Sequence, residues 1–417
     1  MRVRKFFPDL LGNKAGRRFF AFIFYFAEGA PIGFIWWGMP TLLRKNGEDV
    51  DVIGAFIAAL TLPWVFKFLW APLIDILRNK RFGYSKWIGW SQTFMCLSLV
   101  PLLFIPLAGN TLAWGVLLFI HSLCAATQDV AIDAMIIKVV AEKEKGLLNG
   151  FMQAGMLTGR SLFGGGALLL LNELGLPMII GLMIMVIFGI SLLLVFVKEP
   201  RQSFSDKPQL KTFTTRLRSA FGSLNTWYTI GFALTGAAAF EAVGALSGPL
   251  LTDKGLSVEK IGFFFSVPAV ASMLAGSLAG GYISDRFQRK KAITLFLLGS
   301  VITTILLSTA DIVAPTLLPL FHTVLISVIY FFTGMFTSSS YALFMEASDP
   351  DIGATQFSTF MAATNGCEAW VVAAAGMVAA SYGYGWAFLL MCLVSLFSLV
   401  FLFRVKKITA RSRDRNF

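Results

Sequence analysis

Two aspartates within a long apolar segment are the residues of this sequence best placed to do chemistry. The segment spans residues 111–140, reads TLAWGVLLFIHSLCAATQDVAIDAMIIKVV, and contains Gln128, Asp129 and Asp133. On an α-helix, Asp129 and Asp133 lie one turn apart and share a face. Ionised carboxylates inside a bilayer are costly unless they face water or a counter-charge. We therefore expect one aspartate to bind a proton and the other to be paired; the alternative is that both only bridge neighbouring spans.

Two cations also lie within apolar segments. Lys67 sits in the stretch FKFLW, where an unpaired ammonium group would be costly. It is expected either to pair with one of the aspartates or to contact a solute. Arg160, which follows Gly159, could neutralise an aspartate or bind an anionic solute group through two parallel hydrogen bonds.

Other polar residues in apolar segments are candidates for the lining of a cavity. Glu28 is followed by glycines and a proline, which loosen a helix as the cavity-lining helices of transporters require. In the second half of the chain the candidates are Glu241, Asn365 and Glu368. The two histidines, His121 and His322, are interpreted as buried side chains with satisfied hydrogen bonds rather than as a proton relay.

Composition sets the class of protein. The chain has 417 residues, of which 56% are hydrophobic and 14% charged, with a mean hydropathy of +0.73. Soluble proteins carry about a quarter of their residues as charged side chains. The low charge and the long apolar runs predict an all-α polytopic membrane protein. Cys96, Cys124, Cys367 and Cys392 all fall in apolar segments without paired spacing, which predicts buried thiols.

Twelve segments are long and apolar enough to cross a bilayer as helices. They are 18–43, 50–77, 86–107, 111–140, 148–172, 175–197, 227–252, 258–284, 291–310, 315–346, 353–381 and 383–405. A polar, basic stretch separates the first six from the last six. The predicted organisation is a cytoplasmic N-terminal segment (1–17), a six-helix half (18–197), a cytoplasmic linker (198–226), a second six-helix half (227–405) and a basic cytoplasmic tail (406–417).

The distribution of Lys and Arg predicts the orientation. With both termini inside, the cytoplasmic segments carry 29 of the 35 Lys and Arg residues, and the opposite side carries four. This asymmetry predicts a multi-pass membrane protein with both termini in the cytoplasm; the expected location is the bacterial cytoplasmic (inner) membrane. The net charge of +12 is then explained by topology and attraction to anionic lipid rather than by nucleic-acid binding. The basic N-terminal segment lacks a cleavage site of small residues, so the first span is expected to be retained.

The two halves repeat one another. Residues Leu43–Gly47, Val50 and Ile53–Gly54 match Leu251–Gly255, Val258 and Ile261–Gly262 at an offset of 208. Gly146 and Gly159 match Gly353 and Gly366 at an offset of 207. Two pseudo-symmetric six-helix halves facing a central cavity are the arrangement of the major facilitator superfamily.

A motif after the eighth segment agrees with that arrangement. Gly281-Tyr-Ile-Ser-Asp285-Arg286-Phe-Gln-Arg289-Lys290 resembles the G-x-x-x-D-R-x-G-R-[RK] motif of the superfamily, with Gln288 in place of the second glycine. A weaker copy in the first half retains Asp75 and Arg78. The resemblance implies a cytoplasmic gate in which the aspartate caps a helix and the arginine bridges to a carboxylate. The alternative is ordinary positive charge at the interface.

Three further stretches narrow the resemblance. They are FKFLWAPLID (residues 66–75), TQDVAIDA (127–134) and ATQF (354–357). In this order they resemble the AmpG-like branch, which includes muropeptide permeases, acetyl-CoA transporters and siderophore importers of the RhtX/FptX type. The stretches YFAEGAPIGF (25–34) and LPW (62–64) look most like the siderophore importers. The branch often has Arg after the aspartate that matches Asp75, and this chain has Ile76.

The sequence therefore predicts a secondary active, proton-coupled importer of a siderophore or a similar polar, carboxylated solute, working by alternating access in iron acquisition. A muropeptide permease is the alternative, and a non-transporting membrane sensor is disfavoured because the charges inside the spans are retained. We find no phosphate loop, metal cluster or nucleophile–base pattern, so neither enzymatic activity nor a cofactor is expected. The expected partners are the solute, protons and the bilayer, and the expected state is a monomer.

Overall fold

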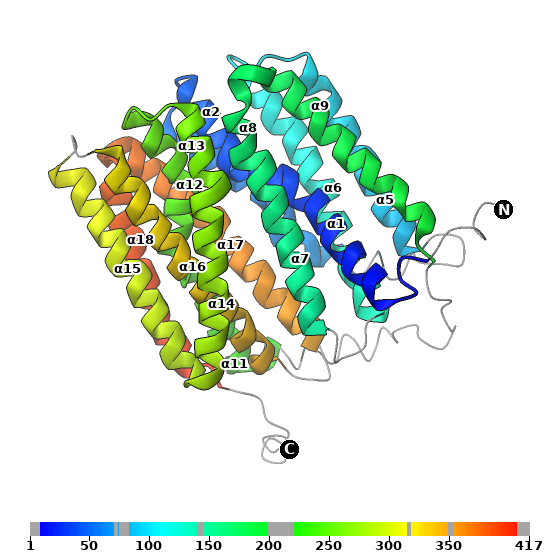
Figure 1. Cartoon of the computed structure of the whole chain (residues 1–417). Helices are drawn as coiled ribbons and strands as arrows, with labels where there is room; N and C mark the ends of the chain where they lie inside the picture. Colours follow the sequence, from blue (N-terminus) through cyan, green and yellow to red (C-terminus); the bar gives the residue numbers. More distant parts are fainter. Residues whose placement is uncertain are drawn as a thin grey trace. The chain divides into compact units, whose positions relative to one another are not determined.

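The computed structural model describes residues 9–70, 74, 83–139, 145–198, 218, 221–314, 318–348 and 353–406, and every regular element among them is a helix (Figure 1). In the first half these elements are α1 (Lys14–Gly33), η2 (Phe34–Gly38), α2 (Met39–Lys45), α3 (Val50–Phe66), η3 (Lys67–Leu69), α5 (Tyr84–Leu99), η4 (Val100–Leu103), α6 (Thr111–Val139), α7 (Lys145–Arg160), η6 (Ser161–Gly165), α8 (Gly166–Leu169), α9 (Leu171–Leu192) and η7 (Leu193–Phe196).

In the second half they are α11 (Leu224–Thr235), α12 (Ala238–Asp253), α13 (Val258–Phe264), η9 (Phe265–Ala269), α14 (Val270–Arg286), α15 (Arg289–Val313), α16 (Pro319–Ala347), α17 (Gly353–Tyr382) and α18 (Tyr384–Arg404). The η elements are short π or 3-10 turns that continue a helix with a different winding. Only helices satisfy every backbone group within one segment, which is why apolar stretches of this length fold this way in a bilayer.

Each of the twelve predicted segments is helical over most of the part that the structure describes; the predicted span 86–107, for example, ceases to be helical after Leu103. Within this described part, nine of them meet the length and hydropathy expected of a membrane-crossing helix. The other three are the predicted spans 86–107, 148–172 and 353–381, which are helical as α5 with η4, as α7 with η6 and α8, and as α17. An all-helical fold is therefore established.

The sequence repeat corresponds to a repeated turn. Gly47 and Gly255 both adopt a positive φ, of 89° and 83°. In each turn the following amide donates to the carbonyl oxygen five residues back, from Glu48 to Leu43 and from Leu256 to Leu251, both at 3.0 Å. This is the helix-ending turn that glycine allows without strain. The match between the halves is therefore structural as well as sequential.

Packing divides the chain into two compact units. The first comprises Met1–Glu48, Phe66–Lys207 and Ser257–Val267, and the second comprises Asp49–Val65, Pro208–Leu256 and Pro268–Phe417. Relative to the two sequence halves, each unit gains one segment from the other half. Each gained segment contains one of the repeated glycines: Gly54 packs on Gly376 of α17 in the second unit, and Gly262 packs on Gly165 of η6 in the first.

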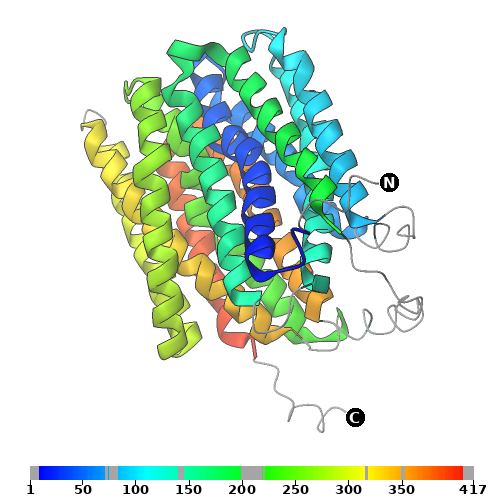
Figure 2. The ribbon, with the colours of Figure 1, turned by 45° about the vertical axis from the view of Figure 1, so that its right-hand side comes forward.

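Within the first unit, α1 and α7 lie side by side along their length (Figures 1 and 2). Glycines make the close approach possible. A Cβ atom on Gly29 would lie 2.2 Å from the carbonyl oxygen of Met156, and one on Gly155 would lie 2.1 Å from that of Phe22. Real Cβ atoms do not come so near to backbone, so α1 is fixed against α7 and its polar side chains are held in place.

The second unit also contains a closely packed pair of helices, α14 and α16 (Figure 1). A Cβ on Gly276 would lie 1.9 Å from the carbonyl oxygen of Phe331, and one on Gly334 would lie 2.1 Å from that of Met273. Small residues at helix interfaces let backbones approach in this way in membranes. The same packing device therefore serves both units.

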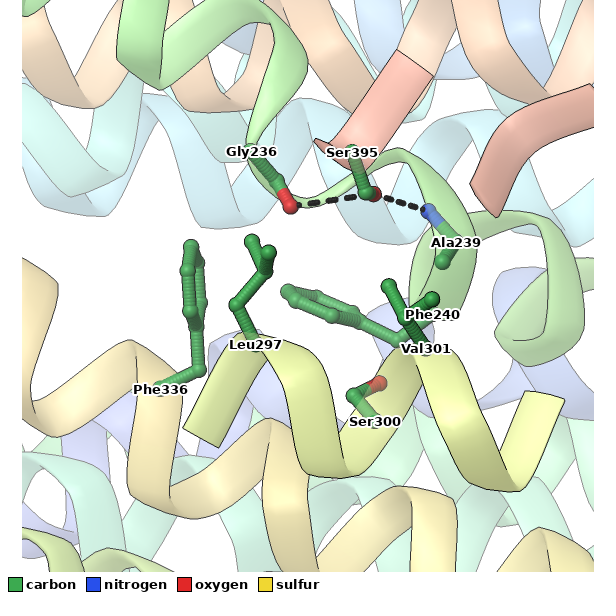
Figure 3. A pocket seen from close by; sticks show the side chains of 8 residues that line it. All are labelled: Gly236, Ala239, Phe240, Leu297, Ser300, Val301, Phe336 and Ser395. Atoms are coloured by element: carbon green, nitrogen blue, oxygen red, sulfur yellow. Dashed lines mark hydrogen bonds between the residues drawn. The ribbon is translucent and has the colours of Figure 1, made fainter. Parts of the chain in front are cut away.

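The seventh span is broken between α11 and α12, and Ser395 of α18 stabilises the break. Its hydroxyl accepts a hydrogen bond from the amide of Ala239 at 2.8 Å and donates to the carbonyl oxygen of Gly236 at 3.2 Å (Figure 3). The break would otherwise leave these backbone groups unpaired in apolar surroundings. The side chains of Phe240 and Phe336 line the same pocket as Gly236 and Ser395.

Candidate functional site

Three charged side chains and one tyrosine of the first unit meet in a cluster, which we call the Lys67–Asp133 cluster; it consists of Tyr25, Lys67, Asp129 and Asp133. Lys67 of η3 forms an ion pair with Asp129 of α6. The side chains of Lys67 and Asp129 are only 17% and 8% exposed. The predicted pairing of Lys67 with an aspartate of span four is therefore present, and Asp129 is its partner.

Asp133 has a different partner. The hydroxyl of Tyr25 donates to Asp133 at 2.5 Å, and its oxygen lies 3.4 Å from Asp129. Among the described residues no cation pairs with Asp133. One aspartate is thus neutralised by an ammonium group and the other is held by a hydroxyl.

Three elements position these groups. Asp129 and Asp133 are one turn apart on α6, as their spacing predicted. Lys67 begins the 3-10 turn that follows the end of α3 at Phe66. Tyr25 is 6% exposed and lies on α1, which its glycines hold against α7. The side chains therefore converge from elements whose backbones are fixed by packing.

Glu28 is a further carboxyl group near the cluster. It lies almost one turn after Tyr25 on α1, is 2% exposed, and acts electrostatically on both Tyr25 and Lys67. Three carboxyl groups and one ammonium group are thus gathered in a buried region. When ionised, these groups carry more negative than positive charge, and like charges repel strongly where the dielectric constant is low.

Arg160 does not neutralise either aspartate, contrary to one of the two roles expected for it. Its Nε atom is buried and has no hydrogen-bond partner, and the part of the chain that the structure describes contains no ion pair between it and the aspartates. The reason is the place at which the end of α7, where Arg160 lies, packs against α1. The backbone of Arg160 touches Gly33, eight residues beyond Tyr25, which is about 12 Å of helix rise. The second role expected for Arg160, binding an anionic group of a solute, stays a prediction.

Gln128 is fully buried next to the cluster. Its exposure is 0%, and neither polar atom of its amide has a partner among the described residues. The histidine of the same helix is also fully buried, with Nδ1 of His121 3.1 Å from the carbonyl oxygen of Met95. This contact agrees with a structural role for His121, but the expected satisfaction is met at only one ring nitrogen: Nε2 of His121, like Nε2 of His322, is buried without a partner among the described residues. Nδ1 of His322 lies 3.5 Å from the carbonyl oxygen of Leu318.

The candidates of the second half lie around α11, α12 and α17. Glu241 is half-buried and lines a cavity of about 40 Å³ together with Phe232 and Phe336. Asn365 of α17 donates to the carbonyl oxygen of Trp64 at 3.5 Å, within the second unit. Glu368 is half-buried on the same helix. The structure thus places Glu241 at a small cavity and both other candidates on α17.

The motif that spans the end of α14 and the start of α15 is arranged differently from the expectation. Arg289, rather than Arg286, bridges to carboxylates: it contacts Asp285 and Glu346, each at 3.1 Å. Arg286 lies over the ring of Tyr282, 4.2 Å from its centroid. Glu346 belongs to α16 of the same unit, so this network ties α14, α15 and α16 together.

Two other expectations about that motif can be assessed. A Cβ on Gly281 would meet open space, so packing does not require glycine at this position. The first-half copy, Asp75 and Arg78, lies outside the described residues. The cysteines are all free; Cys96, Cys367 and Cys392 are buried and Cys124 is half-buried.

Tyr25 is the functional candidate that sequence reasoning missed. It stands in the stretch YFAEGAPIGF, where only Glu28 drew attention. A single hydroxyl in an apolar helix is common, and nothing in the sequence indicates that it faces two carboxylates on another span. The signal that could have found it was its place three residues before Glu28, on the same helical face.

Comparisons with known proteins agree with this architecture. The model of the Major Facilitator Superfamily matches residues 19–367 and, in a second alignment, 242–416. The anhydromuropeptide permease of Escherichia coli (strain K12) is 25% identical over 378 residues, which cover 86% of this chain and 73% of that protein. The resemblance to siderophore importers is not supported by the relatives found.

Solved structures share the fold at low sequence identity. A D-xylose–proton symporter superposes with a TM-score of 0.76 at 14% identity, covering 93% of this chain and 97% of that one. The nucleoside transporter NupG superposes with a TM-score of 0.66 at 16% identity, covering 94% and 100%. With the helical repeat, the paired glycine-rich helices and the family match along most of its length, the chain belongs to the Major Facilitator Superfamily.

Proposed function

We propose that this transporter imports an anhydromuropeptide, or a solute of the same carboxylated peptide–sugar chemistry, together with protons. The observation that carries the proposal is the similarity to the anhydromuropeptide permease of E. coli across 86% of the chain. It favours the permease alternative over siderophore import. The buried cluster of carboxyl groups in the first unit supports the coupling to protons.

Asp133 is the proton carrier in this proposal. The charge of Asp129 is compensated by the ammonium group of Lys67. Asp133 lacks a cation of its own among the described residues and receives the hydroxyl of Tyr25. A proton on Asp133 would remove one net negative charge from the cluster, and the loaded carrier could then reorient with a smaller desolvation penalty.

Arg160 is the proposed contact for a carboxylate of the solute. A guanidinium presents donors in a planar fork that fits a carboxylate, and it stays charged in apolar surroundings. Within the described residues it has no anionic partner, and its buried Nε atom has no acceptor. A carboxylate of the peptide stem would supply both.

The proposed location is the bacterial cytoplasmic membrane, with both termini in the cytoplasm. Support comes from the 29 Lys and Arg residues on one side against four on the other. Fusions of a reporter to either terminus, and to the exposed turn at Gly255, test the orientation. Cytoplasmic signals from both termini, and none from the turn, are expected.

Uptake by the purified protein in liposomes tests the function. Labelled anhydromuropeptide is added outside, with and without an imposed pH gradient that is acidic outside. Accumulation above equilibrium only with the gradient is the expected result. A protonophore should abolish that accumulation, and liposomes without protein should show none.

Competition identifies the solute class. An excess of unlabelled anhydromuropeptide should suppress the uptake, whereas a ferric siderophore should not. Siderophore uptake in place of muropeptide uptake would overturn the assignment of solute. Equal muropeptide uptake with and without the gradient would overturn the assignment of proton coupling.

A further inference from the structure

Tyr25 offers one hydroxyl to two carboxylates. Its oxygen lies 2.5 Å from Oδ1 of Asp133 and 3.4 Å from Oδ1 of Asp129. A phenolic hydroxyl has a single hydrogen to donate, so it serves one acceptor at a time. In the structure it serves Asp133, and a small rotation of the O–H bond would direct the same hydrogen toward Asp129.

We infer that Tyr25 transmits the protonation of Asp133 to the ion pair between Lys67 and Asp129. The inference rests on the proposed proton coupling and adds a residue and a sequence of events to it. Tyr25 is a positioning residue in this scheme, because the proton is bound by Asp133 and not by the tyrosine.

The steps follow from the donors and acceptors present. While Asp133 is ionised, it accepts the hydroxyl of Tyr25, and Asp129 depends on Lys67. When Asp133 takes a proton from water, its carboxyl group becomes a donor and no longer holds that hydroxyl as strongly. The hydroxyl turns to Asp129, which then shares its charge between two donors. The attraction between Lys67 and Asp129 is thereby weakened. In covalent terms, one O–H bond of a hydronium ion breaks, one O–H bond forms on Asp133, and a water molecule is released.

The position of Lys67 in the chain explains why a weaker bond between Lys67 and Asp129 would affect the conformation. Packing assigns the chain up to Val65 to the second unit and the chain from Phe66 to the first. Lys67 lies two residues after Val65 and directly after the end of α3. Its bond to Asp129 therefore fixes the segment in which the chain passes from one unit to the other. Loosening that bond on protonation links proton binding to movement of this segment.

Few charged groups surround Asp133, so a change in the pH profile of uptake can be interpreted. In the described part of the chain they are Glu28 and Tyr25 on α1, Lys67 on η3 and Asp129 on α6. Replacing Tyr25 by Phe removes one donor and leaves the ion pair in place. The ionised form of Asp133 loses its hydrogen bond, so release of the proton becomes harder.

The test compares Tyr25→Phe with wild type in liposomes. Two rates are measured: accumulation of labelled anhydromuropeptide driven by a pH gradient, and counterflow, in which labelled solute exchanges without a gradient. The ratio of accumulation to counterflow should fall at least about tenfold, the equivalent of one charge-assisted hydrogen bond. The pH profile of uptake should shift upward by about one unit.

Tyr384→Phe is the matched control. Its hydroxyl also donates to a carboxylate, that of Asp253 at 2.7 Å, but both residues belong to the second unit and neither to the cluster. This variant should keep the wild-type ratio and pH profile, which excludes a general effect of losing a Tyr–Asp bond. Gel filtration in detergent shows whether both variants are folded.

The outcomes separate this inference from the proposed function. If wild type shows no effect of the pH gradient, the proposed coupling is wrong. If wild type is coupled and Tyr25→Phe matches it in ratio and profile, the coupling stands and the role of Tyr25 is wrong. Equal loss of accumulation and counterflow in a folded variant would also overturn the role, because it would indicate solute binding or structure rather than coupling.

Discussion

Asp129 and Asp133 lie one turn apart on α6, yet among the described residues only Asp129 is paired with a cation. Lys67 bonds to Asp129, whereas Asp133 receives the hydroxyl of Tyr25. Two identical side chains on one helical face thus have unlike electrostatic surroundings. In the proposed function, this asymmetry assigns Asp129 the part of a fixed anchor and Asp133 that of the proton carrier.

Replacing one partner of the ion pair between Lys67 and Asp129 should lower the free energy of unfolding more than replacing both partners. Lys67→Met alone or Asp129→Asn alone leaves a buried group without its partner, and each should lower stability by about 3 kcal/mol. The double variant Lys67→Met with Asp129→Asn should recover most of that loss, because no uncompensated charge remains. Thermal unfolding of the four proteins in detergent measures the coupling. Additive losses would show that the two side chains do not depend on one another.

Close packing of α1 on α7 should make Gly155 intolerant of any side chain. A Cβ there would lie 2.1 Å from the carbonyl oxygen of Phe22, so Gly155→Ala should lower stability by about 1–3 kcal/mol. Gly150 lies on the same helix with open space around it. Gly150→Ala is therefore the control, and it should fold and unfold like wild type. Comparable yields and unfolding temperatures for both variants would contradict the described packing.

Hydropathy predicted most of this fold because it reports directly on the membrane. The expected segment 111–140 is α6 at Thr111–Val139, and the expected segment 353–381 is α17 at Gly353–Tyr382. The break between α11 and α12 was not predicted. It depends on Ser395, which is more than 150 residues away in sequence and supplies partners for the freed backbone groups. Tertiary contacts of this kind leave no local pattern.

The site was predictable in its carboxylates but not in its pairing. Their spacing in the sequence was enough to place Asp129 and Asp133 on one helical face. The free-energy cost of an unpaired ammonium group in a bilayer was enough to require a partner for Lys67. Which aspartate Lys67 meets depends on the 3-10 turn at the end of α3, and the failure of Arg160 to pair depends on how far along α1 the crossing with α7 places it. Both are consequences of helix packing, which one sequence does not reveal.

Arg286, which ends α14, and Arg289, which begins α15, should differ in how much each contributes to the free energy of unfolding. Arg289 joins Asp285 to Glu346 on α16, while Arg286 lies over Tyr282 at the surface. Arg289→Ala should therefore lower stability by about 1–2 kcal/mol, and Arg286→Ala by about 0.5 kcal/mol or less. Unfolding in detergent at low and high salt distinguishes them, since only the first loss should shrink as salt screens the ion pairs. A larger effect of Arg286→Ala would contradict the observed network.

The guanidinium of Arg160, which has no anionic partner in the described part of the chain, should affect solute affinity. Arg160→Gln should raise KM for anhydromuropeptide about tenfold or more, the equivalent of a charge-assisted contact. The matched comparison uses a solute whose carboxylates are amidated, for which wild type and variant should have similar KM values. If the variant weakens both solutes equally, Arg160 does not bind a carboxylate.

Proton movement coupled to solute entry tests the central claim most directly. Liposomes containing the protein and a pH-sensitive dye are mixed with anhydromuropeptide in the absence of an imposed gradient. Acidification of the lumen is expected with wild type, and none is expected with Asp133→Asn, although that variant should still exchange labelled solute. Solute entry without acidification in wild type, or wild-type acidification in Asp133→Asn, would contradict the account.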